Sequence, residues 1–134
     1  MRETIRALLA NDETLAGTLT GGVWAATEIS RQNTAAAFDA NGEILPCALV
    51  RLEAESPVPP YDTSSRLFVV VLFYQRSGYT AIDAAVARTF VLLNKVKVGG
   101  ATWEVLHVGD TLDLEDQALE CNLGMSRYVA VRRR

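Results

Sequence analysis

One stretch of the chain constrains the fold more than any other. Residues 66–76 read RLFVVVLFYQR, with an apolar side chain at every position from 67 to 74. Because side chains alternate between the two faces of a strand, this strand is expected to be apolar on both faces. Such a strand is buried on both faces, so it belongs inside a sheet. We expect a helix to cover the face formed by residues 67, 69, 71 and 73.

The other face of the same strand predicts a subunit interface. With 134 residues, the chain is expected to form a single domain over 1–134. A single small sheet with one helix layer leaves few elements to cover a second apolar face. The hydrophobic fraction of 49% agrees with apolar surface beyond a core. The residues predicted to contact a neighbouring subunit are Phe68, Val70, Leu72 and Tyr74.

Two helices are predicted from their apolar spacing. A short one covers residues 2–10, with a further turn after Asp12. The main one covers residues 80–93, with Thr80 as its N-cap and Asp83 three residues later, a variant of the capping box. Its predicted buried stripe follows helical spacing and consists of Ile82, Ala85, Val86, Thr89, Phe90 and Leu93.

Further strands are predicted at 46–54, 95–98, 102–108 and 119–131. In the last strand we expect one apolar face to be buried, and it consists of Cys121, Leu123, Met125, Val129 and Val131. The acidic segment 109–117 is expected to be a turn, and 23–45 to be loop-like, packing Trp24 and Phe38 onto the domain. Short connections favour antiparallel neighbours, so the fold class is α+β: an antiparallel sheet with one main helix across a face.

Two segments are predicted to contact partners. Three prolines within residues 57–60 should prevent strand pairing and form the stiff tip of a long hairpin. The C-terminal residues 132–134 form a basic tip. For the proline segment the alternative is an ordinary rigid turn. The basic tip is either a solvated tail or docks onto an acidic partner subunit or nucleic acid. The predicted contact residues are Pro57, Val58, Pro59, Pro60, Tyr61, Arg132, Arg133 and Arg134.

No residue pattern in the chain predicts catalysis, a metal site or a cofactor. His107 is the sole histidine and accompanies no nucleophile motif. The acids from Asp110 to Asp116 lack the spacing of a calcium loop, which leaves a solvated turn or a surface for a basic partner. Cys47 and Cys121 match no metal spacing and are expected to be reduced and buried.

Composition also excludes several classes of function. A net charge of −3 argues against a general nucleic-acid binder. No sequence-specific nucleic-acid partner is expected either. No apolar run approaches the roughly 18–20 residues of a membrane span. The start MRET carries an acid and no apolar stretch, so we expect no signal peptide.

The order of these elements resembles the tail terminator and tail completion proteins of long-tailed bacteriophages. The matching features are a Leu45-Pro46 entry into the first strand, the apolar strand 67–74, a helix beginning AIDAAV at 81–86, and a last strand alternating Val and Arg over 128–132. The resemblance covers most of residues 1–134, apart from 23–45.

The resemblance implies a structural role without catalytic residues or cofactors. It implies a ring of identical subunits, expected to be a hexamer, that caps the tail tube protein and joins it to the head connector protein. The expected location is the head–tail junction of the virion, and the host cytoplasm during assembly. The alternatives are another neck protein, such as a head-closure or adaptor ring, or a small ligand-binding or enzymatic α+β domain.

Overall fold

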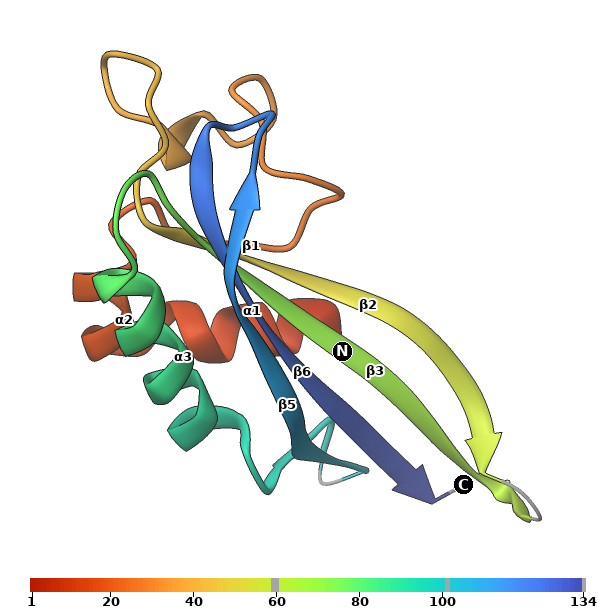
Figure 1. Ribbon diagram of the computed structural model, residues 1–134. Helices are drawn as coiled ribbons and strands as arrows, with labels where there is room; N and C mark the ends of the chain where they lie inside the picture. The colour runs from red at the N-terminus through yellow and green to blue at the C-terminus, as the bar shows by residue number, and fades with distance from the viewer. Residues whose placement is uncertain (59–60, 101, 134) are drawn as a thin grey trace.

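The computed structural model describes residues 1–58, 61–100 and 102–133, with residues 54–58, 61–65 and 133 described by their backbone alone. Within these residues the strands form one sheet in the order β1-β2-β3-β6-β5-β4 (Figure 1). Every pair of neighbours is antiparallel except β1 and β2. The strands are β1 Val23–Trp24, β2 Cys47–Val58, β3 Tyr61–Gln75, β4 Val96–Val98, β5 Trp103–Asp116 and β6 Cys121–Arg133.

The strongly apolar strand lies inside the sheet, as its two apolar faces predict. β3 pairs with β2 on one side and with β6 on the other. The side chains of Leu67, Val69, Val71 and Phe73 belong to the main core, and none is more than 8% exposed. This face of the sheet is therefore the one that the helices cover.

Three helices pack on that face of the sheet. They are α1 Arg2–Ala10, α2 Glu13–Thr18 and α3 Thr80–Leu93. Figure 1 shows them gathered on one side of the curled sheet. Ile5 of α1 and Ile82 of α3 join the same buried cluster as Phe73. The predicted helices at 2–10 and 80–93 and the α+β class are thus confirmed.

The N-terminus of α3 is not capped as the sequence suggested. Tyr79 occupies the N-cap position and its side chain makes no capping hydrogen bond. Instead, Oε1 of Gln75 accepts from the backbone N–H of Ala81 at 2.8 Å and of Ile82 at 3.2 Å. The bend at 76–79 brings the end of β3 back over the start of the helix, so a strand residue satisfies the free N–H groups. The prediction of Thr80 as N-cap was wrong.

The acidic segment 109–117 is a strand for most of its length rather than a turn. β5 continues to Asp116 and pairs with β6 throughout, with irregularities after His107 and after Thr111. Asp113 within the second irregularity has a φ of 59°. Each bulge shifts the alternation of side chains, which removes the period of two that identifies a strand in a sequence.

The buried face of β6 is the opposite of the predicted one. Small or polar residues face the helices, where the buried positions are Gly124, Ser126, Tyr128 and Ala130. Of the predicted face only Cys121 is buried, in the second cluster on the outer side of the sheet. The apolar residues Leu123, Met125, Val129 and Val131 lie half-buried on the outer face. The reason is the close approach of α3, since a Cβ atom at Gly124 would lie 2.6 Å from Cγ2 of Ile82. A large apolar side chain has no room there.

The loop-like segment 23–45 supplies part of the second layer that the sequence left unassigned. It holds β1 and a 3-10 turn at Ala35–Ala37. Ile29, Ala37 and Ile44 form a second buried cluster with residues of the outer sheet face, including Tyr74. Trp24 and Phe38 pack against this cluster, as predicted. One end of the outer face is therefore covered by the chain itself.

Candidate functional site: interaction surfaces

The predicted subunit interface on β3 is less accessible than its sequence suggests. Val70 is 4% and Tyr74 5% exposed, and Tyr74 lies in the cluster formed with segment 23–45. Phe68 and Leu72 are half-buried. The guanidinium of Arg127 lies 5.6 Å from the centre of the Phe68 ring. Contact through Phe68 and Leu72 stays a prediction, whereas Val70 and Tyr74 offer a partner little surface.

A shallow hollow surrounds Leu72 on the outer face. It has a volume of about 320 Å³ and is also lined by Val70, Met125, Leu52 and the charged residues Arg51 and Glu53. Arg127 donates a hydrogen bond from Nη2 to Oε2 of Glu53 at 2.6 Å. The outer face therefore presents apolar area bordered by charges of both signs.

The two predicted partner-contact segments lie side by side. Pro57 pairs with Ser65, and Ser65 also pairs with Arg132, so the hairpin and the C-terminal strand share one end of the sheet. In Figure 1 the paired ends of β2 and β3 and the end of β6 lie together there. We call this end the arm: residues 53–58 of β2, 61–66 of β3 and 131–133 of β6.

The strand pairing of the arm corrects one expectation about its prolines. Pro57 and Val58 stay in the ladder, because Val58 pairs with Tyr61. Pro59, Pro60 and Arg134 lie outside the described residues, and Pro57, Val58, Tyr61 and Arg133 are described by their backbone only. The guanidinium of Arg132 stacks 4.6 Å from the centre of the Trp103 ring, so Arg132 is part of the folded surface rather than of a solvated tail.

A surface that the sequence did not predict lies between α3 and β5. In the part of the chain that the structure describes, the exposed large apolar side chains are Phe90, Val91, Val108 and Leu112. All four belong to these two elements. A hollow of about 450 Å³ there, which we call the groove, is lined by Asp83, Val86, Ala87, Phe90, Asp110 and Leu112. The sequence signal for this surface is the pair of adjacent bulky residues at 90 and 91. A helix cannot bury both in one stripe, so at least one of them must be exposed.

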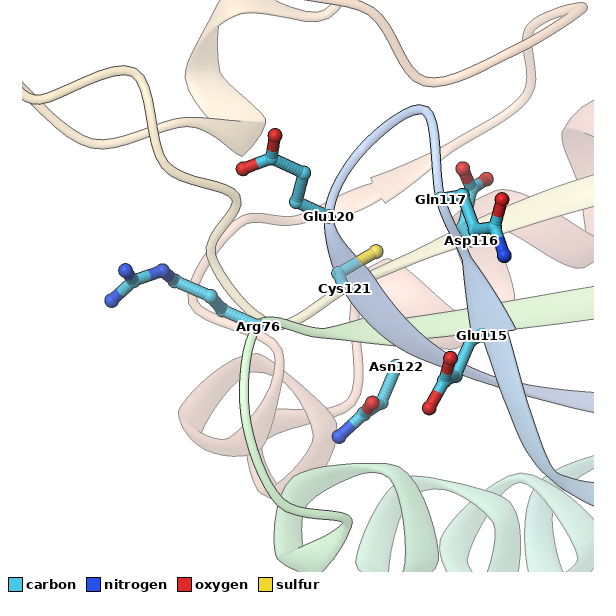
Figure 2. Close-up of a pocket in the computed structure, with 7 residues that line it drawn as sticks. All are labelled: Arg76, Glu115, Asp116, Gln117, Glu120, Cys121 and Asn122. Atoms are coloured by element: carbon cyan, nitrogen blue, oxygen red, sulfur yellow. The ribbon is translucent and has the colours of Figure 1, made fainter.

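The β5–β6 turn carries acids but does not assemble a cation site. A hollow of about 300 Å³ is lined there by Arg76 and by residues 115–117 and 120–122. In Figure 2 the carboxylates of Glu115 and Glu120 point in different directions. Oδ1 of Asp116 accepts from the backbone N–H of Leu119. Among the described residues no group of three or more His, Cys, Asp or Glu could hold a metal ion. The acids therefore form a charged surface.

His107 packs against aromatic rings and lies next to a carboxylate, but it contacts no nucleophile. Its ring contacts Phe90 and Tyr128 edge-on at 5.1 and 5.2 Å between centroids, and Nε2 lies 3.0 Å from Oδ1 of Asp110. Ser126 pairs with Asp110 across the strands, but it is fully buried and its hydroxyl makes no hydrogen bond within the described residues. The nucleophile–base contact that covalent catalysis needs is absent from this trio.

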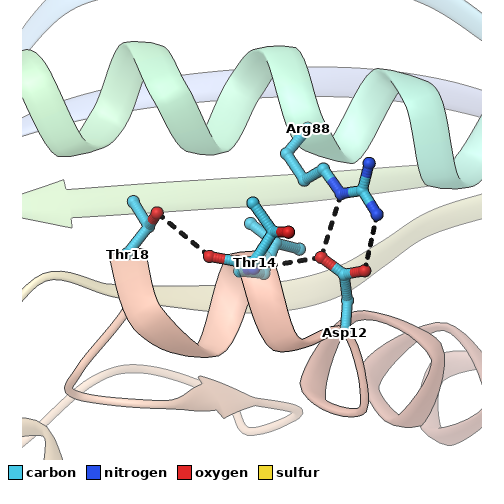
Figure 3. A network of polar contacts seen from close by, with 5 residues as sticks. Asp12, Thr14, Thr18 and Arg88 are labelled. Atoms are coloured by element: carbon cyan, nitrogen blue, oxygen red, sulfur yellow. Dashed lines mark hydrogen bonds and ion pairs between the residues drawn. The ribbon is translucent and has the colours of Figure 1, made fainter.

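A polar network connects α2 to α3 on the helix-covered face of the sheet. Figure 3 shows Asp12 between them. Its Oδ2 accepts from the backbone N–H of Leu15, which caps α2, and its two oxygens accept from Nε and Nη2 of Arg88 at 3.0 and 2.8 Å. These bonds lower the pKa of the Asp12 carboxyl, with the Arg88 contact as the largest cause. The network is structural, because it fastens one helix to another.

This network predicts a pH-dependent effect of Asp12→Asn. The amide keeps a capping oxygen but loses the charge, so we expect the melting temperature at about pH 7 to fall by a few degrees. A lowered pKa in the folded state gives stability that is present above the unfolded pKa of about 4 and is lost as the pH falls below it. Thermal unfolding of both proteins from about pH 7 to about pH 3 checks this. A gap that stays constant over this range contradicts the role of the ion pair.

Comparisons with known proteins find a similar fold but no matching family. No family model matches the chain, and no curated protein is similar to it. Among the described residues, none of the helices has the length and apolar character to cross a bilayer. In fold, the chain is similar to a chain in the structure of the virion of a native gene transfer agent (GTA) particle, with a TM-score of 0.59 and 14% identity. The match covers 99% of this chain and 92% of the other, so the two share a fold along nearly their whole length.

Proposed function

We propose that this chain is a structural protein of a phage-like particle, specifically a tail terminator or tail completion subunit. The observation that carries the proposal is the fold shared with a chain of a GTA virion over 99% of this chain. A match over nearly all of both chains supports a common building block rather than a shared local motif. It agrees with the order of elements that resembles the phage tail terminators.

The surfaces support a role in assembly rather than catalysis. Apolar side chains remain exposed at the groove, and the outer sheet face carries a hollow around Leu72. Contiguous exposed apolar surface marks protein–protein contacts. We propose that the protein is not an enzyme and needs no cofactor. It acts as a ring of identical subunits, a hexamer, that occupies the growing end of the tail tube. The same ring then meets the head connector at the head–tail junction.

The proposal predicts a protein that assembles and that limits tube length. Light scattering and negative-stain microscopy of the purified protein should show a closed ring. When it is added to the tail tube protein of the same genome during assembly, tubes should become shorter and carry a ring at one end. Tubes assembled with bovine serum albumin at the same concentration are the control for a nonspecific effect.

Other outcomes separate the alternatives. A ring that leaves tube length unchanged but binds the connector supports a head-closure or adaptor protein of the neck. A protein that binds neither tube nor connector, and whose melting temperature rises with one member of a metabolite panel, supports the small-ligand-binding class and contradicts the proposed function.

A further inference from the structure

We propose that ordered water lies between α3 and β6 and bridges the buried hydroxyls of Thr89, Ser126 and Tyr128. All three residues are 0% exposed. Their side-chain oxygens are buried as well, and none makes a hydrogen bond to a described residue. Buried polar groups in folded proteins are almost always bonded to protein or to ordered water, because an unbonded one costs free energy. The water site does not depend on the proposed role in assembly, and the two are tested separately.

Helix α3 and strand β6 run side by side in the same direction. Near the start of the helix, Ile82 lies over Gly124 of β6, since a Cβ atom at Gly124 would be 2.6 Å from Cγ2 of Ile82. Just beyond the end of the helix, the backbone N–H of Lys95 donates to the carbonyl of Val105, which pairs with Ala130 of β6. Later residues of the helix therefore lie over later residues of the strand.

This alignment brings the three hydroxyl-bearing residues to the same level. Thr89 follows Ile82 by two helical turns, about 10 Å along the helix axis. Ser126 and Tyr128 follow Gly124 by two and four residues, about 7 and 13 Å along the strand. Alternation from Gly124 puts both strand residues on the helix-covered face, and Thr89 belongs to the buried stripe of α3. Thr89 is therefore level with the interval between Ser126 and Tyr128.

Asp110 lies between these hydroxyls and the solvent. Its partly exposed side chain lines the groove, and the residue pairs with Ser126 across the strands. Burial and the nearby Asp110 raise the pKa of Tyr128, so the phenol hydroxyl keeps its proton at neutral pH and lies near this carboxylate. Asp110 thus marks the place where solvent comes closest to the buried hydroxyls.

Water fits the three hydroxyls better than an ion does. A hydroxyl carries no charge and both donates and accepts hydrogen bonds. Three of them offer a water molecule the two to four polar partners that buried water takes in proteins. The carboxylate of Asp110 lies 3.0 Å from Nε2 of His107, so this charge already has a partner. The space between α3 and β6 is therefore suited to a neutral molecule that can donate and accept.

The test removes each hydroxyl in turn and measures urea unfolding of the full chain. Thr89→Val, Ser126→Ala and Tyr128→Phe each delete one oxygen and keep most of the side-chain shape. Water that loses one of its partners holds the others less well, so each variant should raise the unfolding equilibrium constant by about three- to tenfold. Thr80→Val makes the same change at an exposed position of the same helix and should alter the constant by less than about twofold.

The direction of the change separates bridged hydroxyls from dry ones. Removing a dry hydroxyl relieves the cost of burying an unbonded polar group, so the variants would be at least as stable as the wild type. That result overturns the inference. All variants should keep the wild-type circular dichroism spectrum, which shows that the comparison is made on the same fold.

A double variant tests whether the water is shared. In Thr89→Val combined with Ser126→Ala, the increase in the unfolding constant should be smaller than the product of the two single increases. Increases that multiply fully contradict a bridge between these residues. A crystal structure should show water at about 2.7–3.2 Å from at least two of the three oxygens. Hydroxyls that are bonded to protein side chains instead would exclude the site.

Discussion

Gly124→Ala should destabilise the protein by about 1–3 kcal/mol, although it adds only one methyl group. Gly124 lies on β6 directly under α3, where a Cβ atom would be 2.6 Å from Cγ2 of Ile82. Cγ2 is attached to the Cβ of a residue that is 1% exposed, so it cannot swing away like the end of a long side chain. Either α3 lifts or Ile82 leaves its rotamer, and both disturb the main core.

Gly17→Ala provides the matched control. Gly17 lies within α2, and a Cβ atom there meets nothing within 4 Å. The same substitution should stabilise the protein by about 0.5–1 kcal/mol, because alanine is the better helix former. Urea unfolding of both variants measures the two shifts, which should have opposite signs.

A double-mutant cycle identifies the contact responsible. Ile82→Ala removes Cγ2 and is destabilising alone, but in its presence Gly124→Ala should cost much less than in the wild type. Equal costs of Gly124→Ala in the two backgrounds would mean that the clash with Ile82 does not set the spacing of α3.

Gly124 also shows where sequence reasoning about this fold reached its limit. The run from Leu67 to Tyr74 correctly placed β3 inside the sheet, because an apolar strand of that length needs cover on both faces. In β6 the alternation predicts the wrong face to lie under the helices. Helix α3 approaches so closely that its side of β6 accepts only small residues and one tyrosine, which leaves the more apolar side outward. The distance between helix and sheet is not visible in a local pattern.

The candidate site was predicted only in part for similar reasons. The sequence predicts two separate contact segments, at residues 57–61 and 132–134. Only the register of β3 with β6 places them at the same end of the sheet. The sequence does not predict the groove, because Phe90 fits the helical spacing of the core stripe. The bulges in β5 also interrupt the strand alternation, so Leu112 is predicted to lie in a turn. Segment 23–45 has no periodicity, so its covering of Tyr74 could not be anticipated beyond its packing through Trp24 and Phe38.

The second large effect concerns the buried thiols, which should be nearly inert in the folded protein. Burial raises the pKa of Cys47 from 9.0 to about 12, with a smaller contribution from Cys121. Burial and the nearby Asp116 raise the pKa of Cys121 to about 11. Since the thiolate is the reactive form, both should react with a disulfide reagent at about pH 8 at least a hundredfold more slowly than in the urea-unfolded chain. Fast reaction of either thiol in the native protein would contradict this burial.

The same burial makes the protein sensitive to alkali. A group whose pKa is raised in the folded state leaves stability intact below its unfolded pKa, and stability is lost as the pH rises from there towards the folded pKa. For Cys47 this window runs from about 9 to about 12. Tyr74 in the same cluster also has a raised pKa, chiefly through burial, and extends the loss. The free energy of unfolding should therefore fall steeply between about pH 9 and about pH 12. It should fall less steeply in Cys47→Ala, which has no thiol at this position to ionise on unfolding. Identical slopes for the two proteins would show that Cys47 does not carry the effect.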